Sequence, residues 1–191
     1  MQLVLASMSP RRRELLARAG FIFEVRPSSI NETPLPEEPP EDFARRAAQD
    51  KALAVAAESP PGSLILGADT IVVADHEILG KPADASDALR MLRLLSGRTH
   101  RVITGICIVH PPGSIEAVTH ETTHVTFRTL DEVEIAAYVA SGEPFDKAGA
   151  YGIQGLASKF VTRVEGCYFN VVGLPVALVY DLLKPHLKLG G

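Results

Sequence analysis

Short apolar runs alternate with helical stretches along the whole chain. Continuous or alternating apolar residues are typical of strands, and apolar residues at three- and four-residue spacing are typical of helices. This alternation predicts a mixed α/β domain. The pattern predicts strands over 3–5, 22–25, 64–73, 102–109, 117–127 and 160–164, and helices over 10–19, 40–58, 85–95, 131–141 and 170–187, the last bent or started by Pro175.

Two short segments indicate how neighbouring strands connect. ADHEIL at 74–79 has the composition of a hairpin turn, and HPPGSIEA at 110–117 joins two long runs that we expect to pair antiparallel, so the sheet is expected to be mixed. The proline-rich stretch NETPLPEEPPED at 31–42 follows too few residues to separate two domains. We interpret it as a mobile loop beside the site and treat 1–191 as a single domain.

Composition narrows the class of protein. The chain has 191 residues, 46% hydrophobic and 22% charged, with a net charge of −4, which is typical of a globular protein and argues against a nucleic-acid polymer as partner. No run approaches the roughly 20 apolar residues of a membrane helix, and no signal peptide is recognisable. We therefore expect a cytoplasmic protein without a membrane partner. Neither cysteine belongs to a CxxC pair or a Cys/His cluster with zinc spacing.

Three consecutive arginines, at 11–13, stand where the first helix is expected to begin. In LASMSPRRRELL at 5–16, Ser9 and Pro10 are typical of an N-cap and a first helical position. A helix N-terminus already carries about half a positive charge, so each added cation is unfavourable by about 0.3–1 kcal/mol. One interpretation is a solvated basic turn. The other is a phosphate site in which helix amides, guanidinium groups and the hydroxyls of Ser7 and Ser9 converge on one anion.

An acidic residue interrupts the most apolar predicted strand. LILGADTIVV at 64–73 contains Asp69, whose burial without a partner would cost several kcal/mol. The carboxylate is either satisfied by backbone amides in a turn, or it is a metal ligand or general base. We favour the second interpretation because the neighbouring Gly67 would let a ligand approach closely.

Two lysines could add cations to an anion site. Lys81, in ILGKP, lies in a rigid and exposed connection between a glycine and a proline. Lys51, in AAQDKALAVAA, lies on a predicted helix and could equally be an ordinary solvated lysine. The chain has no G-x-x-x-x-G-K-[ST] motif, so a P-loop is excluded.

A glycine-rich segment, DKAGAYGIQGLASKF at 146–160, could approach a ligand with its backbone. It is a weak dinucleotide-binding signal because no strand precedes it. Its Gln154 carries an amide that could read the edge of a base as donor and acceptor together. In SGRTHRVITG at 96–105, His100 has no recognisable nucleophile as partner, so we interpret it as structural.

Together these segments resemble the Maf family of nucleotide pyrophosphatases. The resemblance runs through LASMSPRRRELL, GADTIV, LGKP, SGRTHRVITG, SGEPFDKAGAYGIQG and NVVGLPV. It implies an elongated mixed-sheet α/β fold similar to that of inosine-triphosphate pyrophosphatases, with two lobes around a cleft, and a homodimer. It also implies hydrolysis of a nucleoside triphosphate to the monophosphate and pyrophosphate with a divalent cation, Mg²⁺ or Mn²⁺. Thr70 follows GAD and Gln154 follows YGI, and in this the chain resembles the branch of the family that acts on dTTP and UTP. Modified pyrimidine nucleotides are further candidate substrates.

The resemblance assigns roles residue by residue. Asp69 matches the essential acid of the family, and the positions associated with substrate choice are Arg11, Thr70 and Gln154. We further hypothesise that Asp69, helped by Glu32 from the proline-rich loop, binds the metal ion and activates water. The triphosphate is expected to be held by Ser7, Ser9, Arg11, Arg12, Lys51 and Lys81, with Arg13 left in solvent.

Two alternatives remain open at this point. The same hydrolysis could act on 7-methyl-GTP or another modified nucleotide, because the choice of base depends on few side chains. The protein could also be a regulator of cell division that binds nucleotides without turnover, although binding alone would not require an acid suited to a metal ion.

Overall fold

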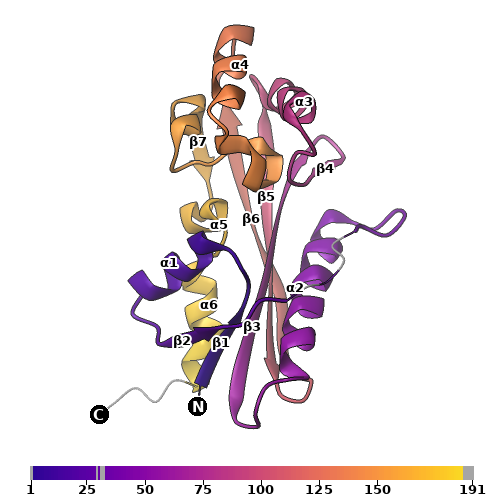
Figure 1. Cartoon of the computed structure of the whole chain (residues 1–191), viewed down its shortest axis with the longest axis vertical. Coiled ribbons are helices and arrows are strands. Elements are labelled where there is room, and N and C mark those ends of the chain that lie inside the picture. The colour runs from indigo at the N-terminus through magenta and orange to yellow at the C-terminus, as the bar shows by residue number, and fades with distance from the viewer. Residues whose placement is uncertain (1, 29, 31–32, 187–191) are drawn as a thin grey trace. The chain divides into compact units, whose positions relative to one another are not determined.

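The secondary structure follows the predicted alternation closely. The computed structural model describes residues 2–28, 30 and 33–186. Its strands are β1 (Gln2–Ala6), β2 (Phe23–Val25), β3 (Ser63–Ala74), β4 (Glu77–Leu79), β5 (Thr99–His110), β6 (Ser114–Phe127) and β7 (Val161–Glu165) (Figure 1). Its α-helices are α1 (Pro10–Arg18), α2 (Pro40–Ala56), α3 (Ala85–Leu95), α4 (Glu132–Ala140), α5 (Tyr168–Val172) and α6 (Val176–Leu183). Short 3₁₀ turns, η1 (Glu143–Asp146), η2 (Ala148–Ala150), η3 (Leu156–Phe160) and η4 (Lys184–His186), complete the chain.

The strands form one mixed sheet, which confirms the predicted mixed α/β class. The strand order is β2-β1-β3-β5-β6-β7, and β4 pairs with β3. β1 is parallel to both β2 and β3, whereas β3 and β4, and likewise β6 and β7, are antiparallel. The β3–β4 pairing confirms the hairpin predicted over 74–79. Within the described residues, no helix is long and apolar enough to cross a membrane.

The chain divides into two compact units that three strands join. The first unit comprises Met1–Asp69, Thr104–Glu121 and Gly173–Gly191, and the second comprises Thr70–Ile103 and Thr122–Val172. β3, β5 and β6 each run from one unit into the other, and β3 does so between Asp69 and the next residue.

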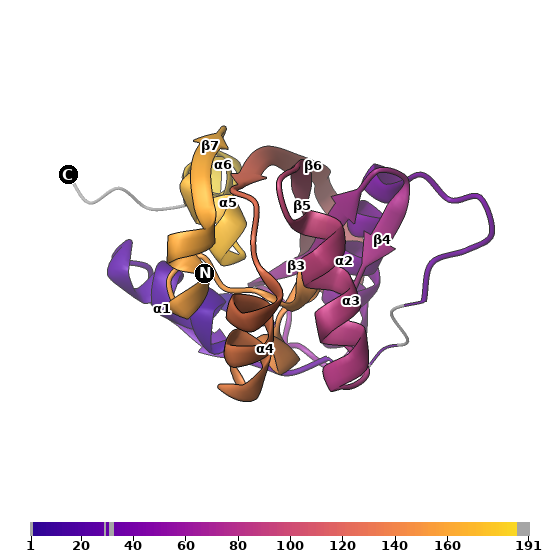
Figure 2. The same ribbon diagram turned by 90° about the horizontal axis from the view of Figure 1, so that it is seen from above.

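In the first unit, α2 covers one face of the sheet and α1 and α6 cover the other (Figures 1 and 2). Two strand glycines permit the close approach of α2. A Cβ on Gly67 would lie 2.8 Å from the Cβ of Ala52 and would overlap the carbonyl of Ala48, and a Cβ on Gly105 would overlap the carbonyl of Ala44. The helix therefore packs with its alanines directly on the strand backbone.

In the second unit, α3 packs on α4, and an aromatic core lies beside them. His100 is buried between the rings of Phe127 and Tyr151, and its Nε2 lies 2.8 Å from the Tyr151 hydroxyl. Burial lowers the pKa of His100 to about 4, so the ring is neutral at pH 7. His100 is thus structural, as the sequence predicted.

The last predicted helix, 170–187, is two helices instead of one. α5 ends at Val172, and α6 begins at Val176 after Gly173 and Pro175. Gly173 has a backbone φ of +130°, which residues other than glycine rarely adopt. Pro175 lacks the N–H that a continuous helix would need.

Candidate active site

The first helix begins as its sequence predicts and leaves its N-terminus without an acidic residue. Ser9 caps α1 by accepting a hydrogen bond from the Arg12 amide at 3.4 Å, and Pro10 is the first helical residue. The Ser7 hydroxyl oxygen accepts from the Ser9 amide at 3.2 Å and from Arg12 Nη1 at 3.2 Å. Two accepted bonds occupy both lone pairs of a hydroxyl, so Ser7 is left to donate its O–H. A phosphate oxygen would be a suitable acceptor.

Arg12 is buried, with 8% of its surface exposed. Its Nε donates to the Gly173 carbonyl at 2.8 Å, and its Nη1 donates to the Ala68 carbonyl at 2.8 Å as well as to Ser7. The side chain therefore ties the start of α1 to the residue that precedes Asp69. This role was not predicted from the sequence, where Arg12 was expected only to bind phosphate.

Asp69 and Lys51 form a buried ion pair. The Lys51 Nζ lies 2.6 Å from Asp69 Oδ1, and the two residues are 7% and 5% exposed. The ammonium contributes the compensation that a carboxylate in this strand requires. Lys51 is therefore not a solvated lysine. The reason given for a ligand site at Asp69 was wrong in one respect, because the space above Gly67 is filled by α2 and not by a ligand.

Three charged side chains are buried in this region. Among the described residues, the buried side chains that are charged at neutral pH are Arg12, Lys51 and Asp69, all in the first unit. Two buried cations accompany one buried carboxylate, and the α1 N-terminus adds the positive end of a helix dipole. The positive end of a helix dipole attracts anions.

Asp69 is also the residue of this region that could bind a divalent cation. Glu32, the second ligand predicted from the sequence, lies outside the described residues. Among the residues that are described, the three-residue His/Cys/Asp/Glu groups close enough to hold an ion do not include Asp69. Mg²⁺ commonly binds through one or two carboxylates together with substrate phosphates, so a single aspartate fits an ion that arrives with the nucleotide.

The second unit contains the other predicted residues. Thr70 is half-buried on β3, and Lys81 is exposed just after β4. In the β3–β4 hairpin Val72 pairs with Leu79, so Lys81 follows the strand that runs back toward Thr70. The Gly149 amide donates to the Gly80 carbonyl at 3.0 Å. This bond fixes the loop of Lys81 to the glycine-rich segment within the same unit.

Gln154 is exposed in a segment that Glu143 holds in place. One Glu143 carboxylate oxygen accepts from the Tyr138 hydroxyl at 3.0 Å, and the other accepts from the Leu156 amide at 2.9 Å. A Cβ on Gly155 would overlap this carboxylate. Neither Glu143 nor Tyr138 was predicted from the sequence to have this role. The structure shows a succession of 3₁₀ turns folded around them.

The sequence has clear relatives among curated proteins. A dTTP/UTP pyrophosphatase of Koribacter versatilis is 54% identical over 184 residues, which cover 96% of this chain and 94% of the relative. A dTTP/UTP pyrophosphatase of Moorella thermoacetica is 54% identical over 182 residues, covering 95% and 93%. A crystal structure of a nucleoside-triphosphatase, a dITP/XTP pyrophosphatase from Mycobacterium abscessus, aligns over 98% of both chains with 19% identity and a low TM-score of 0.40.

The family is assigned from sequence alone. The profile of the Maf-like proteins matches residues 2–186, a range that includes both compact units. The half-identical relatives match nearly their whole length, and the site motifs of the first unit lie within the matched range. This chain belongs to the Maf-like protein family.

Proposed function

We propose that this protein hydrolyses nucleoside triphosphates, dTTP and UTP first among them, to the nucleoside monophosphate and pyrophosphate. Water attacks the α-phosphorus, a new P–O bond forms, and the bond from the α-phosphorus to the α–β bridging oxygen breaks. Pyrophosphate leaves with the bonding electron pair. Negative charge grows on the bridging oxygen and on the leaving group, so the reaction needs cations around the phosphate chain.

The start of α1 is the observation that carries this proposal. The Ser9-capped helix has no acidic residue in its first turn, and the Ser7 hydroxyl, whose oxygen already accepts two hydrogen bonds, has its O–H left to donate. The buried Arg12 and the ion pair of Lys51 with Asp69 lie in the same unit. Hydrogen-bond donors at the positive end of a helix dipole are suited to phosphate oxygens.

The residues of the first unit have different roles in the proposed reaction: some bind phosphate and others position the loop or Asp69. The Ser7 hydroxyl and the half-exposed Arg11 donate to phosphate oxygens, and the Ser9-capped helix presents its amides. Arg12 positions this loop through the Gly173 and Ala68 carbonyls and adds its charge. Lys51 holds the Asp69 carboxylate and shares its ammonium with the phosphates.

Asp69 orients the attacking water and takes up its proton. A divalent cation, Mg²⁺ or Mn²⁺, would be held by Asp69 together with the substrate phosphates, where it neutralises phosphate charge and lowers the pKa of water. We retain Glu32 as the proposed second carboxylate. Lys51 Nζ contacts Asp69 Oδ1 at 2.6 Å and so helps to orient this carboxylate.

Residues of the second unit are proposed to bind the rest of the nucleotide. Thr70 and Gln154 carry groups that can donate and accept, as recognition of a pyrimidine edge requires, and Lys81 adds an exposed cation for the phosphates. The Glu143–Tyr138 network holds the backbone on both sides of Gln154, at Gly152 and Leu156. A site held in place loses less entropy when it binds its ligand.

Release of pyrophosphate from a panel of nucleotides tests the proposal. The purified protein is assayed with Mg²⁺ or Mn²⁺ and dTTP, UTP, CTP, ATP, GTP and 7-methyl-GTP. We expect release from dTTP and UTP, and its loss in Asp69→Asn. Release from 7-methyl-GTP alone would assign a different base. Nucleotide binding without release from any of the six would instead support a regulator without turnover.

Assembly and location form a separate part of the proposal. We propose a homodimer, which light scattering coupled to size-exclusion chromatography would detect, and a cytoplasmic location, which cell fractionation would detect. A monomeric mass, or recovery outside the cytoplasmic fraction, would contradict these two points without bearing on the hydrolysis.

A further inference from the structure

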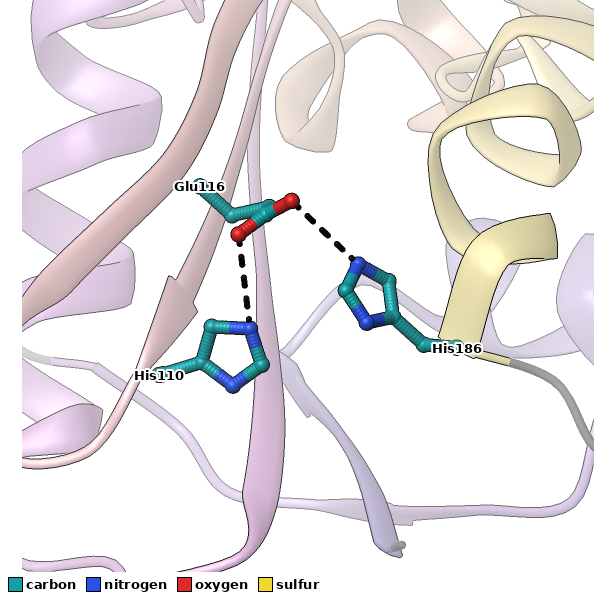
Figure 3. A group of neighbouring side chains, drawn as sticks. All are labelled: His110, Glu116 and His186. Atoms are coloured by element: carbon teal, nitrogen blue, oxygen red, sulfur yellow. Dashed lines mark ion pairs between the residues drawn. The ribbon is translucent and has the colours of Figure 1, made fainter.

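Two histidines and a glutamate meet at the turn end of the β5–β6 hairpin. His110 is the last residue of β5, Glu116 lies near the start of β6, and His186 ends the 3₁₀ turn that follows α6. The three side chains point toward one another from these separate elements (Figure 3). All three belong to the first unit.

The spacing of their donor atoms is that of a metal site. His110 Nε2 lies 3.6 Å from one Glu116 carboxylate oxygen, and His186 Nε2 lies 3.6 Å from the other. The ligand atoms of all three residues lie within 4.8 Å of one another. Two ligands bound at about 2.0–2.1 Å to a tetrahedral zinc ion lie roughly 3.3–3.4 Å apart. The two 3.6 Å separations exceed the usual hydrogen-bond length and need only a small contraction to reach this value, whereas the widest separation, at most 4.8 Å, needs a larger one.

His186, at the end of the described residues, has a buried ring nitrogen that makes no hydrogen bond. His186 is a mostly buried side chain, 17% exposed, and its Nε2 is buried with no hydrogen-bond partner. The two imidazole rings are close, with centroids 5.3 Å apart and an interplanar angle of 69°. A buried nitrogen that makes no hydrogen bond is costly unless something else binds it.

We propose that His110, Glu116 and His186 bind a divalent transition metal ion, Zn²⁺ by preference. Two neutral imidazoles and one carboxylate are a usual zinc ligand set, and imidazole favours Zn²⁺ over Mg²⁺ or Ca²⁺, which prefer oxygen. Three protein ligands leave one coordination position for water. The bound ion joins the turn after α6 to the β5–β6 hairpin and thereby stabilises the C-terminal part of the first unit.

This site is separate from the Asp69 region. β3 leaves the first unit directly after Asp69, and β5 enters it at Thr104, six residues before His110. At about 3.3 Å per residue, His110 lies roughly 20 Å along β5 from the point where that strand enters the unit. Strand alternation also distinguishes the two faces: Val109 packs in the core cluster beneath α2, so the next residue, His110, points to the opposite face. The ion would therefore act on stability and not on the hydrolysis.

Zinc titration of the full chain tests the site. Because Asp69 could itself bind Zn²⁺, calorimetry is performed on Asp69→Asn after treatment with a chelator, and then on the same variant carrying His186→Gln or Glu116→Gln. We expect one Zn²⁺ per chain, and an affinity lower by at least roughly tenfold when either ligand is changed. The matched control is His124→Gln, which replaces an exposed histidine of β6 outside the cluster. It should leave the affinity unchanged.

A second readout does not depend on the affinity measurement. Zn²⁺ should raise the Tm of the protein with intact ligands by several degrees, and it should not raise the Tm of the His186→Gln chain. Circular dichroism before titration verifies that each variant is folded. The proposal is overturned if Zn²⁺ fails to bind the folded Asp69→Asn chain, or if it binds with equal affinity and an equal Tm shift after His186→Gln.

Discussion

Removing one partner of the Lys51–Asp69 pair should destabilise the protein strongly. Lys51→Met leaves the carboxylate buried without its ammonium, and Asp69→Asn leaves the ammonium buried without its carboxylate. The atoms lie 2.6 Å apart, and both side chains are less than one tenth exposed, so solvent can replace neither partner. Breaking a buried pair in this way costs about 3–5 kcal/mol. For a chain of this size the Tm should fall by roughly 6–20 °C.

The double variant separates the effect of the ion pair on stability from its effect on hydrolysis. When Lys51→Met and Asp69→Asn are combined, neither leaves the other charge unpaired, and replacement of a whole buried pair is often close to neutral. We therefore expect the double variant to regain most of the lost stability, within about 1–2 kcal/mol of the unmodified chain. Hydrolysis should be absent in the two variants that lack Asp69, the proposed general base, and strongly reduced in Lys51→Met, which lacks the ammonium that contacts this carboxylate.

Urea unfolding followed by circular dichroism suits this protein, which has no tryptophan for fluorescence. The four free energies of unfolding give the coupling energy directly. Single variants within about 1 kcal/mol of the unmodified chain would contradict the burial of the pair. A double variant that recovers hydrolysis together with stability would show that the role of Asp69 is only structural.

Three further predictions concern single residues. Gly67→Ala should cost about 1–3 kcal/mol or more and reduce hydrolysis, because its Cβ would overlap the α2 backbone; Gly80→Ala, where a Cβ meets nothing within 4 Å, is the control in thermal unfolding. As the pH falls from about 6.5 to about 4, the unfolded chain takes up a proton at His100 and the folded chain does not. About 3 kcal/mol is lost in that window, and His100→Gln should lack this part of the pH dependence of unfolding. Glu143→Gln should raise KM for dTTP more than it lowers kcat, and an unchanged KM would contradict the positioning of the base-binding segment.

Local signals were sufficient for most of the fold. α3 spans the predicted 85–95 because Asp84 caps it with a hydrogen bond to the Asp87 amide, and such a cap can be recognised from sequence. The turns between Glu143 and Phe160 could not be predicted, because they are held by contacts of Glu143 with Tyr138 and Leu156. Such contacts leave no periodic pattern in the local sequence.

The candidate site was predictable only in part. An aspartate within an apolar strand indicates that a partner exists, but it does not say which one. Lys51 could be identified only after the helix position was known, because its reach to Asp69 depends on how closely α2 approaches Gly67. The cluster of His110, Glu116 and His186 left no sequence signal, since its last member comes from the far end of the chain.

The three arginines of α1 show how one helix turn divides a motif between structure and binding. Successive helical residues are about 100° apart, so only one of the three can face the interior. That residue is Arg12, which shares its face with Leu15 and Leu16, both buried, at spacings of three and four. A guanidinium on a core face must donate to carbonyls, which here are those of Ala68 in β3 and of Gly173 before α6. In the proposed site, Arg11 and the helix amides would therefore contact the anion, while Arg13 faces solvent.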